Sequence, residues 1–236
     1  MSNITRRSLA AGAGLLAGAV ALRTGAQQVE QIAAAAAAPK FRVQPLSFNP
    51  EKISGLSAKA VTEHHDQHYA DAVNRLNAIN DRLAKLDFSQ VPAAELGALK
   101  RDEHIAYNST VLHELYFDCL GEAPTQPSGV FAQALARDFG SLDRWKAEFA
   151  ATGKALNGGS GWVILVYAPR DKRLFNHWAA DDGMAPAGGV PLLALDMSEH
   201  AYRMDYGSDS AKYVETFVRT IRWIAPERFY REAIRV

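Results

Sequence analysis

The chain has 236 residues, with 26 basic and 26 acidic side chains. Three arginines and one glutamate lie within the first 38 residues, so residues 39–236 carry 23 Lys+Arg and 25 Asp+Glu, a net charge of −2. This balance argues against nucleic acid as a main partner. About 200 residues are enough for one sizeable hydrophobic core or two small lobes. The single cysteine, Cys119, cannot form an internal disulfide, and its apolar helical surroundings predict a buried structural thiol.

The first 38 residues have the pattern of an export signal rather than of a folded domain. Arg6-Arg7 precedes a run of Ala, Gly, Leu and Val from Ser8 to Leu22, and small residues recur up to the run Ala33–Ala38. The twin arginines resemble a Tat signal, which predicts a bacterial periplasmic location. The alternative is an uncleaved membrane anchor, but this segment is less apolar than a membrane span. We expect no stable membrane association after cleavage.

A long helix is predicted from Leu56 to Leu86. Apolar residues follow steps of three and four along it and form one stripe. His64 and His68 lie on this stripe, so we expect them to face the core. His65 should point away from the stripe and be exposed.

A second long helix is predicted from Ala93 to about Leu120, where Gly121 and Pro124 end it. It carries His113 and Tyr116. Because only a short loop separates two long helices, we expect an antiparallel hairpin that makes residues 39–125 an N-terminal helical domain.

The remaining part, residues 126–236, mixes helices and strands. Asp171-Lys172 forms a predicted turn between the first two strands, which makes them a hairpin. The predicted strands are Trp162–Tyr167, Arg173–Ala179 and Val190–Leu195, and the predicted helices are Val130–Phe139, Leu142–Leu156, Asp209–Ile224 and Pro226–Arg235. The predicted fold class is therefore α+β, with a long antiparallel helical hairpin followed by a lobe in which helices cover a three-stranded antiparallel sheet.

Four side chains are candidate metal ligands: His64 and His113 on inward helix faces, and Asp196 and His200 at the end of the last strand. Imidazole and carboxylate ligands suit Mn, Fe or Zn. Three neutral imidazoles and one carboxylate give the site a charge of +1 with M²⁺ and +2 with M³⁺, so it could cycle by one electron. A lone buried histidine is more often hydrogen-bonded than metallated. For this reason His104 and His177, which fit no such pattern, are interpreted as non-ligands.

Four motifs resemble the iron/manganese superoxide dismutases in order and spacing. They are His64-His65-Asp66-Gln67-His68, Val111–Tyr116, Gly159-Ser160-Gly161-Trp162 and Asp196-x-x-Glu199-His200-Ala201-Tyr202. The resemblance runs from about Leu46 to Ile234. It implies dismutation of superoxide to O₂ and H₂O₂ at one Fe or Mn ion per subunit, with His64, His113, Asp196 and His200 as the ligands.

The resemblance also implies residues around these ligands and a homodimer. His68, Trp162 and Tyr116 match residues that surround the metal in the family. Glu199 matches a glutamate of the family. That glutamate reaches across the dimer to the other subunit's ligand histidine and orients it.

Several positions depart from the family pattern. Ala72 occupies the position at which the family has a tyrosine that guards the substrate funnel. The family also has a glutamine or histidine that hydrogen-bonds the metal-bound solvent. Its helix position is occupied here by Ser109, and its sheet position falls within Ala180-Asp181-Asp182. A carboxylate there would accept rather than donate a hydrogen bond. Three further departures are Phe117, Ser198 and Arg203, which replace a tryptophan, an aromatic residue and the tyrosine that bridges subunits.

Dismutation is the leading prediction, and Arg203 could steer an anion towards the site. Two alternatives remain open at this point. One is a metalloenzyme of this fold with other oxidative or hydrolytic chemistry on a larger substrate, for which the small Ala72 would leave room. The other is a periplasmic metal-binding protein without turnover.

Overall fold

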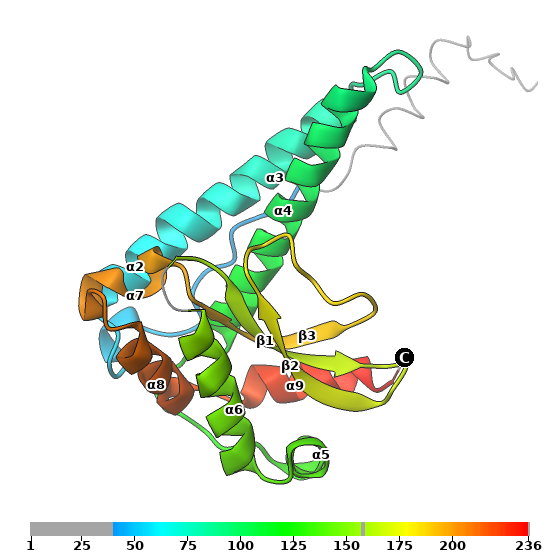
Figure 1. The fold of residues 1–236 in the computed structure, drawn as a ribbon. Coiled ribbons are helices and arrows are strands. Elements are labelled where there is room, and N and C mark those ends of the chain that lie inside the picture. The colour runs from blue at the N-terminus through cyan, green and yellow to red at the C-terminus, as the bar shows by residue number, and fades with distance from the viewer. Residues whose placement is uncertain (1–39, 157–158, 236) are drawn as a thin grey trace, which may run out of the picture. The chain divides into compact units, whose positions relative to one another are not determined.

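Figure 1 shows a computed structural model of the chain, which describes residues 40–156 and 159–235. The predicted signal segment, residues 1–38, lies outside this part, so export stays a prediction. Within the described part, no helix combines the length and the apolar character that crossing a membrane requires.

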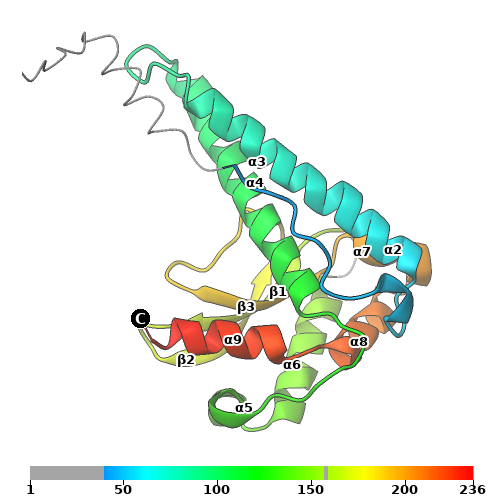
Figure 2. The same ribbon diagram turned by 180° about the vertical axis from the view of Figure 1, so that it is seen from behind.

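The first half of this part is a pair of long helical stretches that run side by side (Figures 1 and 2). A short 3₁₀ helix, η1 (Pro50–Lys52), leads into the first stretch, which starts where Ser57 Oγ accepts a hydrogen bond from the Ala60 N–H at 3.1 Å. Residues 84–92 connect the two stretches, and the ion pairs Arg75–Asp102 and Arg82–Glu95 join them. The elements are α2 (Ala58–Glu63), η2 (His64–Tyr69), α3 (Ala70–Leu83) and α4 (Ala93–Asp118).

The first stretch is not the single regular helix that its periodicity predicts. Its middle segment, η2, is a π-helix, in which the Ala70 N–H bonds to the His65 carbonyl five residues back. A π turn holds an extra residue, so side chains after its start are rotated relative to a regular helix. The prediction that His65 is exposed was wrong: its exposure is 7%, because the segment before η1 lies against it, with the Gln44 carbonyl oxygen 2.8 Å from His65 Nε2.

The second half contains the sheet. Helices α5 (Gly129–Phe139) and α6 (Leu142–Ala155) precede strands β1 (Trp162–Ala168), β2 (Arg173–Ala179) and β3 (Val190–Asp196). Helices α7 (Glu199–Tyr206), α8 (Ser210–Thr220) and α9 (Ile224–Ala233) follow. The strands are antiparallel in the order β2-β1-β3, with α4 and α9 packed on β3 and α6 packed on β1 and β2. The predicted α+β class is confirmed.

The strand register places two predicted site residues side by side. Trp162, the first residue of β1, pairs with Asp196, the last residue of β3. Gly161, directly before β1, lies against the end of β2: its φ is +118°, and an added Cβ would lie 2.4 Å from the Ala179 carbonyl oxygen. Gly161 also accepts a hydrogen bond from the Met197 N–H at 2.8 Å, which continues the pairing past the end of β3.

One large hydrophobic core joins the helical pair to the sheet. It extends from Phe48 in the segment before η1 to Ala233 in α9 and includes the whole of β1 up to Tyr167. Cys119 belongs to it, is fully buried and is a free thiol, as predicted. Burial raises the pKa of this thiol, so it stays protonated. The core holds the elements that carry the site in fixed positions.

Candidate metal centre

Four side chains from four elements meet in the interior. His64 comes from η2, His113 from α4, Asp196 from the end of β3, and His200 from the first turn of α7. One ligand atom from each lies within 4.8 Å of the others. These are the four residues predicted as metal ligands.

The Asp196 carboxylate lies at the centre of this cluster. Its Oδ2 is 3.1 Å from His64 Nε2, 3.0 Å from His200 Nε2 and 3.7 Å from His113 Nε2. Its Oδ1 accepts a hydrogen bond from the Ser198 N–H at 2.7 Å. Complete burial alone would raise the pKa of Asp196, but the histidines outweigh it and hold this pKa well below its ordinary value. The group is therefore an anionic ligand.

The histidines are arranged as neutral ligands. His113 Nδ1 lies 2.7 Å from the Ser109 carbonyl oxygen, which can only accept, so Nδ1 carries the proton and Nε2 keeps its lone pair. Burial lowers the pKa of His113 to about 3, and burial likewise lowers the pKa of His64. Both Nε2 atoms are buried without a hydrogen-bond partner. Such orphaned nitrogens beside a carboxylate are what a bound metal ion would satisfy, so the site fits one.

One side of the cluster faces the interior. Trp162 is 2% exposed, and its ring meets the His113 ring edge-on at 5.2 Å. Its Nε1 donates to Asp182 Oδ1 at 2.9 Å. Asp181, by contrast, is exposed and accepts from the Gly183 N–H of its own turn at 2.8 Å. The structure therefore brings Asp182, and not Asp181, against the predicted site residues.

Burial raises the pKa of Asp182, although the bond from Trp162 opposes this shift. On the same interior side, the ring of Tyr116 lies 4.8 Å from that of His64. The Tyr213 hydroxyl, 3.3 Å from that of Tyr116, donates to the Asp196 carbonyl at 2.9 Å. The sequence analysis missed Tyr213, because nothing in an amphipathic helix marks which residue reaches a strand end.

The opposite side of the cluster reaches the surface. The His200 side chain is 27% exposed and stacks on the half-buried His68, with ring centroids 3.8 Å apart and an interplanar angle of 10°. Burial lowers the pKa of His68 as well. Glu199 and Arg203 are exposed and form an i,i+4 ion pair on α7.

The positions that depart from the family pattern lie around the same centre. Ser109 contributes its backbone carbonyl, as described, and its hydroxyl lies 3.5 Å from His113 Nδ1. The Phe117 ring is 5.1 Å from that of His64, and Ala72 is buried in α3. The two histidines interpreted as non-ligands, His104 and His177, are both outside the cluster.

Known proteins resemble this chain along most of its length. A family model described as iron/manganese superoxide dismutases, C-terminal domain, matches residues 127–228. An iron superoxide dismutase of Cupriavidus metallidurans is 50% identical over 195 residues, which cover 83% of this chain and 98% of the relative. A manganese superoxide dismutase of Halobacterium salinarum is 35% identical over 201 residues, with 83% and 98% covered. A Mn/Fe superoxide dismutase of Propionibacterium freudenreichii subsp. shermanii is 33% identical over 175 residues, with 71% and 85% covered.

An α+β fold that brings three histidines and one aspartate together around a common point defines a mononuclear metalloprotein. The identity and coverage of the relatives specify it further: the chain belongs to the iron/manganese superoxide dismutase family. The predicted family, with iron or manganese at the site of His64, His113, Asp196 and His200, is confirmed.

Proposed function

We propose that this chain disproportionates superoxide at one iron or manganese ion held by His64, His113, Asp196 and His200. The observation that carries the proposal is the buried cluster itself, with two orphaned imidazole nitrogens beside an ionised carboxylate in a chain of this family. When bound, the metal supplies one-electron exchange with superoxide. One superoxide is oxidised to O₂, and a second takes up the electron and two protons and becomes H₂O₂.

The chain's own residues prepare this reaction. Burial keeps the imidazoles of His64 and His113 neutral, and three imidazole ligands with one carboxylate leave the loaded site a net positive charge that favours an anionic substrate. Access is from the side of His68 and His200, where Glu199 and Arg203 form an exposed ion pair. Trp162 closes the opposite side against water.

Asp182 is proposed as the residue that replaces the family's solvent-binding glutamine. Its support is the hydrogen bond from Trp162, whose ring contacts His113, and the second anchor that Asn108 Nδ2 provides by donating to the Asp182 carbonyl at 2.6 Å. Through Trp162 it would fix the ring that packs on His113. A carboxyl differs from an amide in charge and in donor capacity, so we expect it to alter the metal's reduction potential.

The test is superoxide consumption by pulse radiolysis, on metal-analysed protein loaded separately with iron and manganese. Fast turnover with one or both metals supports dismutation and identifies the working metal. Bound metal with negligible turnover would contradict dismutation. It would instead favour one of the two alternatives, chemistry on a larger substrate or metal binding without catalysis. Asp182→Asn keeps the acceptor for Trp162 but removes the charge, so we expect a shifted reduction potential with metal content unchanged. Asp181→Asn is the matched control.

Export and dimerisation complete the proposal. The Arg6-Arg7 pattern supports Tat export of folded, metal-loaded protein to the periplasm. Replacement of both arginines by lysine should keep the protein in the cytoplasm, and undiminished periplasmic protein would contradict this route. The exposed Glu199 and Arg203 beside His200 support a homodimer in which Glu199 bonds the partner's ligand histidine.

A further inference from the structure

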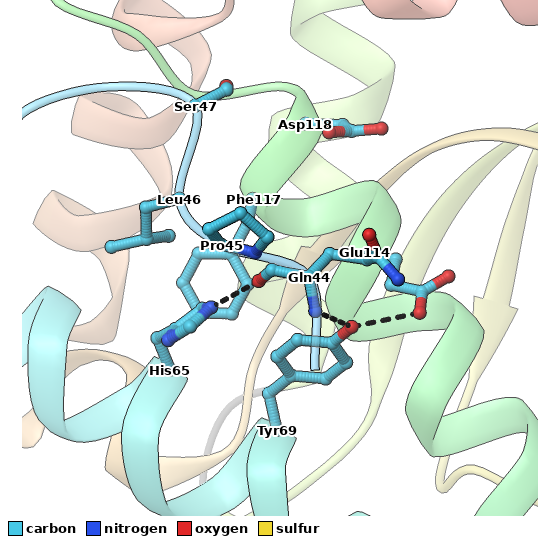
Figure 3. Close-up of a pocket in the computed structure, with 9 residues that line it drawn as sticks. All are labelled: Gln44, Pro45, Leu46, Ser47, His65, Tyr69, Glu114, Phe117 and Asp118. Atoms are coloured by element: carbon cyan, nitrogen blue, oxygen red, sulfur yellow. Dashed lines mark hydrogen bonds between the residues drawn. The ribbon is translucent and has the colours of Figure 1, made fainter. Parts of the chain in front are cut away.

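A small cavity of about 90 Å³ lies between the segment before η1, the π turn and the end of α4 (Figure 3). Gln44, His65, Tyr69 and Glu114 contribute polar groups to its lining. None of these four is a metal ligand. The cavity nevertheless adjoins the two helical elements that carry His64 and His113.

The Tyr69 hydroxyl joins three separate parts of the chain at this cavity. It lies 3.0 Å from the Gln44 backbone nitrogen and 2.9 Å from Glu114 Oε1 (Figure 3). Because a backbone N–H can only donate, the hydroxyl accepts from Gln44 and gives its single proton to Glu114. The Tyr69 ring is 1% exposed, so both bonds are shielded from solvent exchange.

Gln44 binds the π turn a second time. Its carbonyl oxygen lies 2.8 Å from His65 Nε2, which donates to it (Figure 3). One peptide segment therefore holds two residues of η2, one through its N–H and one through its C=O. His65 and Tyr69 are four residues apart within η2, so both side chains lie on the same side of the helix.

These contacts lie one residue away from two ligands. His65 directly follows His64, and Glu114 directly follows His113. The Tyr69 ring also stacks against the His113 ring, at 6.2 Å between centroids and 24° between planes. A movement of η2 relative to α4 would therefore have to break the Tyr69–Glu114 bond before it could separate His64 from His113.

We propose that Tyr69 is a positioning residue of the metal centre, whose hydroxyl fixes the helix turn carrying His64 to the helix carrying His113. It touches neither the metal nor the substrate. Its effect passes through the relative position of two ligands, and so it sets the geometry and the retention of the bound ion. The inference rests on the proposed metal binding.

The test is Tyr69→Phe in the otherwise unaltered, iron(III)-loaded protein. The variant keeps the buried ring and loses both hydroxyl bonds. We expect a changed rhombicity in the electron paramagnetic resonance spectrum and about tenfold faster release of iron to EDTA, at the low end of the effects of residues that orient metal ligands. Tyr230→Phe is the matched control, because Tyr230 is also a buried tyrosine but packs on Phe131 and Tyr167, away from the site.

A merely structural role predicts a different result. Tyr69→Phe would then lower the melting temperature of the metal-free protein, as Tyr230→Phe does, but leave the spectrum and the release rate unchanged. That outcome would overturn the inference. Wild-type protein that takes up neither iron nor manganese would instead contradict the proposed function.

Variants of Glu114 test the Tyr69–Glu114 hydrogen bond from its acceptor side. Glu114→Gln keeps an oxygen acceptor for the Tyr69 hydroxyl, so we expect near wild-type spectrum and release. Glu114→Leu removes the acceptor and should reproduce Tyr69→Phe. The inference would fail if Gln and Leu at this position behaved alike, and this pair keeps the test available should Tyr69→Phe not fold.

Discussion

The two sides of the metal site are built differently. On the interior side, His64, His113 and Asp196 are at most 3% exposed and their positions are set by core packing and by bonds to backbone carbonyls and amides. On the surface side, His200 leans on the half-buried His68, and its neighbours Glu199 and Arg203 are exposed.

Because of this difference, the two sides of the metal site depend on different parts of the protein. The interior side is determined within one chain, because every contact that orients its ligands comes from residues in the same core. On the surface side, no element of the described residues covers the charged groups next to the ligand His200. A second subunit would supply that cover, and each prediction below changes one side and leaves the other intact.

The largest effect is expected on the interior side. His113→Ala removes a ligand that no neighbour can replace, so it should lose most of the bound metal, with an affinity loss above the roughly 10–100-fold typical of residues that only orient ligands. Metal analysis after purification measures this. His104→Ala is the control on the same helix, because His104 is exposed and bonds only outside the cluster. Full metal retention by His113→Ala would refute the ligand assignment.

A smaller effect is expected on the surface side. Glu199→Ala should leave the interior ligands in place but weaken the proposed dimer about tenfold to a hundredfold, as the loss of a hydrogen bond to a charged group would. Sedimentation over a concentration series measures this. Glu215→Ala is the control, since Glu215 on α8 forms an exposed ion pair with Lys154 of α6. An unchanged dissociation constant would show that Glu199 does not reach a partner.

The smallest effect is expected at Asp138, which lies away from both sides of the metal site. Burial alone would raise the pKa of Asp138, but bonds from Arg137 and the Leu174 N–H outweigh it and lower this pKa. A lowered folded-state pKa adds stability that is complete above the unfolded value of about 3.9 and is lost as pH falls through the folded value. Asp138→Asn should therefore reduce the free energy of unfolding by about 1–2 kcal/mol at pH 7.

Urea unfolding at pH 7 and pH 3, at matched metal content, measures this. The difference between the two proteins should shrink at the lower pH, as Asp138 begins to take up a proton. Asp143→Asn is the control, because that side chain is 95% exposed. A difference that is no smaller at pH 3 than at pH 7 would show that the carboxylate charge is not the cause, and lost metal would show that the region is coupled to the site.

The sequence predicted those features that repeat along the chain or match a motif. Apolar periodicity located the long helices, alternation and turns located the three strands, and four motifs located the ligands. It could not show the π turn, because periodicity assumes a regular helix, nor that the segment before η1 folds back over His65. Nor could it choose between Asp181 and Asp182, since that choice depends on how a loop folds back onto Trp162.

The π turn also limits how the chain can change in length. If one residue were deleted between His64 and Tyr69, the helix could return to its regular repeat, and everything before the deletion would rotate by about 100° relative to α3. The backbone would gain a more regular hydrogen-bond pattern, while His64 would turn away from its three partners. In the segment from His64 to Tyr69, selection would therefore act on the number of residues as well as on their identity.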